Sequence, residues 1–154
     1  MTIDTPDLHS ILNDLIQTCK DGQQGFLDAA HHVRDANMKS LFLELSQERS
    51  RFAGDLQLGV TRLRGFPETH GSATGALRRG WVDFKAKIIG QSDTAAIQSA
   101  EQGEDAAVEA YQKALEKELP GDIRDIVERQ LQSILEAHRR LRAHEVRLSG
   151  GAAG

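Results

Sequence analysis

The chain has little cysteine and little proline, and it has no long run of apolar residues. Its single cysteine, Cys19, excludes an intramolecular disulfide and favours a reducing compartment. No apolar segment approaches the length that spans a bilayer, and the first residues lack the pattern of a signal peptide. With only 3 prolines and few β-branched runs, the sequence predicts an all-α protein. We therefore expect a cytoplasmic protein with no membrane partner.

An excess of basic charge and the common catalytic motifs are also missing. The formal net charge is -4 at pH 7, which argues against a nucleic-acid partner held by overall charge. The sequence contains no nucleophile elbow, phosphate loop or cysteine–zinc motif, so an enzyme is less expected than a binding or structural protein. The length of 154 residues suits one domain with a substantial core.

Apolar residues recur at helical spacing along four long stretches, which predicts four amphipathic helices. Gly65 ends the second of these helices, and Ser92 or Asp93 can cap the third. A shorter, basic helix is expected between the second and the third. The five predicted helices cover residues 6–35, 38–64, 76–89, 94–118 and 122–148.

This order of helices predicts a four-helix bundle in which the first two and the last two long helices form hairpins. The short helix would be a crossover that makes the second and third long helices parallel, as in ferritin-like bundles. We expect a single domain over residues 1–148, followed by a disordered tail of small residues over 149–154.

One stretch of the third long helix places carboxylates where a core is expected. Glu104 lies in the middle of the apolar face, and Glu101 lies at its edge, one turn earlier. A buried carboxylate is costly unless it is paired, hydrogen-bonded or bound to a metal. Counting from the turns at about 1.5 Å per residue brings polar side chains of all four helices to one layer near the middle of the bundle. This polar layer contains Gln23, Glu48, Arg49, Glu101, Glu104 and His138.

The polar layer has the position and part of the composition of a di-metal carboxylate site. Such sites combine glutamates from two helices with Glu-x-x-His motifs from the other two, and they bind divalent iron or manganese. The metal hypothesis therefore predicts a metal-binding or oxidative-stress protein that holds iron or manganese. Its ligands would be Glu48, Glu101, Glu104 and His138, with Gln23 as a further candidate.

The alternative is a metal-free layer, because Arg49 on the core face competes with a metal for the same carboxylates. Arg49 would then pair with Glu104 or Glu48. His138 and Tyr111 would complete a buried cluster of ion pairs and hydrogen bonds. Under this hypothesis the chain is a structural module that associates with copies of itself.

The short helix predicted over 76–89 could supply the contact between copies. Trp81 lies on its apolar stripe, and Arg78 and Arg79 make it basic. One interpretation is an interface that makes the protein a homo-oligomer. The other is a crossover helix that Trp81 packs onto the bundle.

A set of short motifs runs along nearly the whole chain. The most specific are Gly103-Glu104-Asp105 and Arg79-Gly80-Trp81, and the others include Asp21-Gly22, Gln47-Glu48-Arg49 and Leu119-Pro120. Together they resemble an uncharacterised bacterial family of ferritin-like four-helix-bundle proteins, a domain family of unknown function. The resemblance implies the fold and a bacterial cytoplasmic setting, and it implies no activity, since a fold does not fix a function.

Overall fold

The computed structural model describes residues 5–63 and 92–153, which form four helices. These are α1 (Thr5–His32), α2 (Ala36–Arg62), α4 (Asp93–Leu115) and α5 (Gly121–Ala153). No strand occurs among the described residues, so the predicted all-α class is confirmed. None of the helices described is long and apolar enough to cross a membrane. The predicted helix over 76–89, with Arg78, Arg79 and Trp81, lies outside the described residues.

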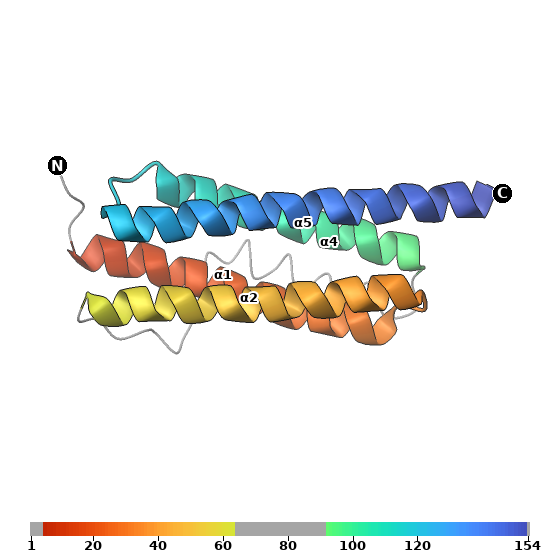
Figure 1. The fold of residues 1–154 in the computed structure, drawn as a ribbon, viewed down its shortest axis with the longest axis horizontal. Coiled ribbons are helices and arrows are strands. Elements are labelled where there is room, and N and C mark those ends of the chain that lie inside the picture. Colours follow the sequence, from red (N-terminus) through yellow and green to blue (C-terminus); the bar gives the residue numbers. More distant parts are fainter. Residues whose placement is uncertain (1–4, 64–91, 154) are drawn as a thin grey trace.

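Two antiparallel hairpins pack against each other to form the bundle (Figure 1). α1 and α2 form the first hairpin, and α4 and α5 form the second. Between the hairpins, α1 contacts α4 and α2 contacts α5. α2 and α4 therefore occupy opposite corners and run in the same direction, so the chain between Leu63 and Ser92 connects opposite ends of the bundle (Figure 1).

The turn between α1 and α2 differs from the sequence prediction, which continued the first helix to residue 35. Asp35 lies outside α1 and caps α2, because its side chain accepts a hydrogen bond from the Met38 N–H at 2.8 Å. The backbone N–H groups of Arg34 and Asp35 donate to the two carboxylate oxygens of Asp93, at 2.9 and 2.8 Å. This turn is fixed by bonds to the other hairpin, which helical periodicity does not reveal.

The C-terminal end of α5 also differs from the prediction. The sequence predicted a helix to residue 148 and a disordered tail over 149–154, whereas α5 continues to Ala153. Its last turns extend beyond the ends of the neighbouring helices (Figure 1). No proline interrupts this stretch, and each residue added to an existing helix gains a hydrogen bond without the cost of nucleation. At α4 the prediction is confirmed, since the Ser92 side chain accepts a hydrogen bond from the Ala95 N–H.

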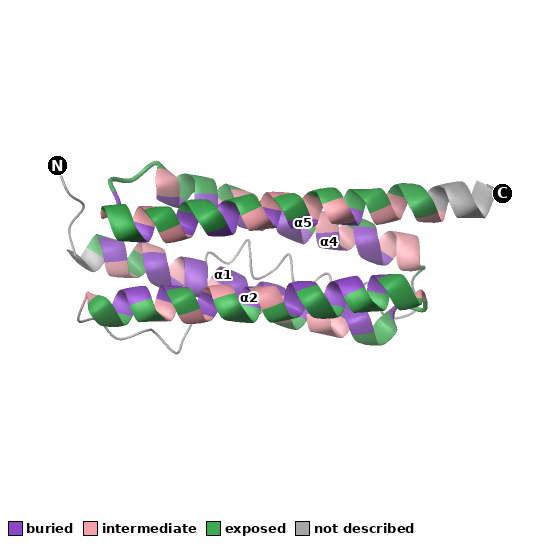
Figure 2. Cartoon of the chain, viewed as in Figure 1, coloured by how far each residue is buried: buried purple, intermediate pink, exposed green. Residues whose placement is uncertain are grey.

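Two apolar clusters follow one another along the bundle axis and form its core (Figure 2). One cluster includes Leu12 and Leu56, and the other includes Phe26 and Phe42. The buried Arg49 lies on α2 between the residues that this helix contributes to the two clusters. The core is therefore interrupted near its middle by charge.

Candidate functional site

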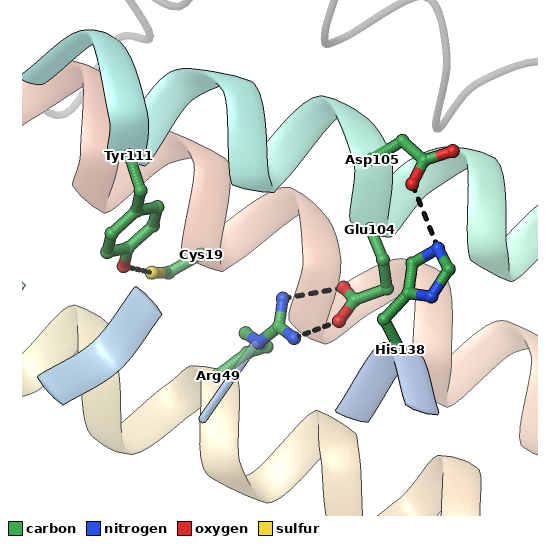
Figure 3. Close-up of polar contacts among 6 residues, drawn as sticks. All are labelled: Cys19, Arg49, Glu104, Asp105, Tyr111 and His138. Atoms are coloured by element: carbon green, nitrogen blue, oxygen red, sulfur yellow. Dashed lines mark hydrogen bonds and ion pairs between the residues drawn. The ribbon is translucent and has the colours of Figure 1, made fainter. Parts of the chain in front are cut away.

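Arg49 reaches across the bundle interior from α2 to Glu104 on α4 (Figure 3). Its Nη1 donates to Oε1 of Glu104 at 2.8 Å, and its Nη2 donates to Oε2 at 2.5 Å. Arg49 is 1% exposed and Glu104 is 0% exposed. Two parallel charge-assisted bonds are the strongest geometry available to an arginine and a carboxylate. Of the two partners that the sequence offered for Arg49 under the metal-free alternative, Glu104 and Glu48, the structure shows Glu104.

Two aromatic rings and a glycine surround the Arg49 side chain. Its Cζ lies 5.5 Å from the centroid of the Phe26 ring and 5.9 Å from that of Phe52, within the range of cation–π attraction. A Cβ at Gly22 would lie 3.5 Å from Cγ of Arg49, so this glycine faces the arginine. Burial lowers the pKa of Arg49, but the charge of Glu104 and its hydrogen bonds outweigh burial and raise it. The guanidinium therefore stays charged in its apolar surroundings.

A chain of hydrogen bonds links all four helices beside the ion pair. Tyr111 Oη on α4 donates to Gln130 Oε1 on α5 at 2.7 Å, and Gln130 Nε2 donates to the Phe52 carbonyl on α2 at 3.3 Å. The sulfur of Cys19 on α1 lies 3.0 Å from Tyr111 Oη (Figure 3). Because the Tyr111 proton points to Gln130, the Cys19 thiol is the donor. Burial raises the pKa of Cys19 to about 11, which keeps this donor protonated.

Tyr111 therefore differs from the role predicted for it. It bonds Cys19 and Gln130, two residues that the sequence did not connect with the polar layer. The signal for Gln130 was a polar residue on the apolar face of the last helix. Cys19 gave no polar signal, because a buried cysteine usually behaves as a small apolar residue.

His138 points away from Glu104 and toward Asp105 (Figure 3). Its Nε2 lies 2.9 Å from Oδ1 of Asp105, whose side chain is 69% exposed. His138 thus joins α5 to α4 at the edge of the bundle. The sequence missed Asp105 as its partner, although Asp105 directly follows Glu104.

Glu101 also faces α5. It shares a hydrogen bond with Glu145, which accepts a second one from Gln98 Nε2 at 3.1 Å. Burial, and then the neighbouring Glu145, raise the pKa of Glu101 to about 7. The bond from Gln98 is the main reason that the pKa of Glu145 is lowered. Oε1 of Glu101 is buried and finds no hydrogen-bond partner in the described part of the chain.

Glu48 lies half-buried on α2, next to Arg49 in the sequence. Burial raises its pKa, and the charge of Arg49 opposes that shift. Its Oε1 is buried without a hydrogen-bond partner among residues 5–63 and 92–153. Gln23, the further candidate on α1, contributes its backbone carbonyl, which accepts a bond from Ser46 Oγ at 2.8 Å.

The structure therefore divides the predicted polar layer. Arg49 and Glu104 meet at its centre, whereas Glu101 and His138 bond to side chains at the α4–α5 interface. Within the two described stretches, no group of three or more His, Cys, Asp or Glu residues is arranged to hold a metal ion. Both oxygens of Glu104 already bind a cation, so this arrangement does not fit the predicted di-metal layer.

Comparison with known protein families gives a match. A family model described as "Domain of unknown function (DUF2383)" matches residues 7–117. The matched range includes both partners of the ion pair, Arg49 and Glu104, and it ends before α5. None of the curated proteins compared with the chain matches it.

Proposed function

The chain belongs to the DUF2383 family, and from that premise we propose that it is a metal-free structural module that associates with copies of itself. The observation that carries the metal-free part of this proposal is the ion pair between Arg49 and Glu104, and self-association is carried over from the sequence hypothesis. A guanidinium that binds both carboxylate oxygens neutralises the buried charge that a metal ion would otherwise neutralise.

The ferritin-like topology is part of the proposal. It is supported by the two antiparallel hairpins and by the common direction of α2 and α4 (Figure 1). A crossover helix over 76–89 would complete it. The bacterial and cytoplasmic setting is carried over from the resemblance of the sequence motifs.

The ion pair would fix how the two hairpins dock. Arg49 belongs to the first hairpin and Glu104 to the second, and their helices stand at opposite corners of the bundle. The planar guanidinium accepts a carboxylate in a narrow range of orientations. A shifted or inverted hairpin would leave a buried charge unpaired, at a cost of about 3–5 kcal/mol. Self-association would use surfaces outside this layer, and the residues around Trp81 are the candidate contact.

The competing hypothesis is iron or manganese bound by Glu48, Glu101, Glu104 and His138, with a stress-related role. One observation favours it. Oε1 of Glu48 and Oε1 of Glu101 are buried without hydrogen-bond partners in the described residues. Buried carboxylate oxygens usually have a partner, and a metal ion or a water molecule can be that partner.

Elemental analysis of the freshly purified protein separates the two hypotheses. We expect neither iron nor manganese near one ion per chain, before or after anaerobic Fe(II) addition and air oxidation. We also expect a species larger than the monomer by light scattering, and a monomer would reject the self-association. Stoichiometric metal that is lost in Glu104→Ala would reject the metal-free module. Glu109→Ala is the matched control, because Glu109 lies on the same helix with its side chain 68% exposed.

A further inference from the structure

We infer that the Arg49 guanidinium occupies a latent cation site in the bundle interior, and that its removal lets Glu104 and Glu48 bind a divalent cation. The inference rests on the proposed metal-free function and deepens it. It identifies Arg49 as the side chain that keeps metal ions out of the core, and Glu104 and Glu48 as the side chains that would bind a metal ion.

The acceptors of this latent site are carboxylate oxygens. Both oxygens of Glu104 accept hydrogen bonds from Arg49, and both bonds would be lost with the guanidinium. Oε1 of Glu48 is buried and has no hydrogen-bond partner in the part of the chain that is described. Glu48 directly precedes Arg49 on α2. Burial raises the pKa of Glu48, and the charge of Glu104 adds to that shift. Hard divalent cations such as Mn²⁺ prefer oxygen ligands of this kind and complete their shell with water.

The space for a hydrated ion would come from the arginine side chain. Arg49 passes Gly22 and lies near the rings of Phe26 and Phe52 before it reaches Glu104. A Cβ at position 22 would lie 3.5 Å from Cγ and 3.7 Å from Nη1 of Arg49, so truncation of residue 49 would open space next to this glycine. The Nε of Arg49 is buried and has no bond to other described residues, so one donor of the guanidinium is left unsatisfied.

Cation binding would be driven by the charge of Glu104 that remains when Arg49 is removed. Glu104 is 0% exposed, so without Arg49 its charge is far from solvent. An uncompensated buried carboxylate must take up a proton or a cation, because its desolvation cost is large. A bound cation stabilises only the folded chain, so it must raise the melting temperature.

The test compares Mn²⁺ binding to the full-length wild type and to Arg49→Ala, by electron paramagnetic resonance of free Mn²⁺ and by melting temperature. Arg49→Ala should bind about one Mn²⁺ per chain, and its melting temperature should rise by roughly 5–10 °C at saturation. Arg49→Lys retains a cation and should bind none. Arg49→Ala combined with Glu104→Gln should lose the binding. Arg140→Ala is the matched control, because it breaks an exposed Arg–Glu fork and should behave as the wild type.

The outcomes are distinct. If neither the wild type nor Arg49→Ala binds Mn²⁺, the latent site is overturned and the proposed function is left intact. Wild-type protein that binds Mn²⁺ through Glu104 would overturn both. If Arg49→Ala is unfolded alone, Mn²⁺ should restore its helical circular dichroism. The measurement is then repeated on Arg49→Gln, which retains more of the side-chain volume. If Mn²⁺ neither binds nor stabilises either variant, the inference is rejected.

Discussion

Two arginine–glutamate forks join helices of this bundle, and they differ mainly in their surroundings. Arg49 and Glu104 are 1% and 0% exposed, whereas Arg140 of α5 and Glu44 of α2 are 39% and 58% exposed. The bonds are similar in length, at 2.8 and 2.5 Å in the interior and 3.1 and 2.8 Å at the surface. Water can replace either partner of the outer fork, but it cannot reach the inner one. The same contact is therefore decisive for stability in one region and nearly neutral in the other.

Arg49→Met would break the inner fork and should have the largest effect. It leaves the buried carboxyl group of Glu104 without its partner, so the free energy of unfolding should fall by about 3–5 kcal/mol. Urea denaturation at neutral pH measures the change. A loss below about 1 kcal/mol would place the inner fork in the same class as a surface pair.

Removing both inner charges together sharpens the comparison. Arg49→Met combined with Glu104→Leu should recover most of the loss, because apolar groups of similar volume replace a buried ion pair at little cost or with a gain of about 1–4 kcal/mol. A double-mutant cycle on the free energy of unfolding measures the coupling. If the double variant is as unstable as Arg49→Met, then packing around Phe26 and Phe52, and not charge, explains the first result.

Glu101 provides a third case, a carboxyl group that faces another carboxyl group in place of an arginine. Its pKa is about 7 in the folded chain, against an ordinary value of 4.5 for a glutamate, so between these values the folded state binds more protons than the unfolded state. The contribution of Glu101 to stability is therefore present at low pH and is lost as the pH rises from about 4.5 to 7. Glu101→Gln should flatten this part of the pH profile and raise the melting temperature at pH 8 relative to wild type.

The comparison for Glu101 is made as the difference between wild-type and variant profiles. Other groups contribute to the same profile, since burial lowers the pKa of His144. The lowered pKa of Glu145 affects stability only at more acidic pH. Parallel profiles for wild type and Glu101→Gln between pH 5 and 8 would contradict the prediction.

Breaking the outer fork should have the smallest effect. Arg140→Gln should lower the free energy of unfolding by about 1 kcal/mol at most, since exposed ion pairs contribute little. That small loss should shrink further in 1 M salt, where surface charges are screened within about 3 Å. A loss as large as that of Arg49→Met would show that exposure is not what separates the two forks.

The sequence predicted the four long helices because each has an apolar stripe, and a stripe is a property of one segment alone. It also predicted, under the metal-free alternative, that Arg49 pairs with Glu104 or with Glu48. Both charges lie near the centre of apolar faces, and a buried charge must find its opposite. The predicted end of the first helix was less accurate, because bonds to Asp93 of the other hairpin fix the turn that follows this helix.

The partners of Glu101 and His138 could not be predicted in the same way. Both lie at the edges of their faces, where a small rotation of the helix decides whether a side chain points to the core or to a neighbouring helix. Glu101 turns to Glu145, and His138 turns to Asp105. The sequence therefore predicted the height of a residue along the bundle axis better than the direction in which its side chain points around that axis.

The hydrogen-bond chain through Cys19, Tyr111, Gln130 and the Phe52 carbonyl takes one group from each helix. Each bond has a direction, since thiol donates to hydroxyl, hydroxyl to amide oxygen, and amide nitrogen to carbonyl. The apolar clusters, by contrast, would accept a hairpin docked upside down with little change in buried area. An inverted hairpin would present different groups at these contacts and would leave buried donors and acceptors unpaired. The hydrogen bonds therefore favour one arrangement of the two hairpins.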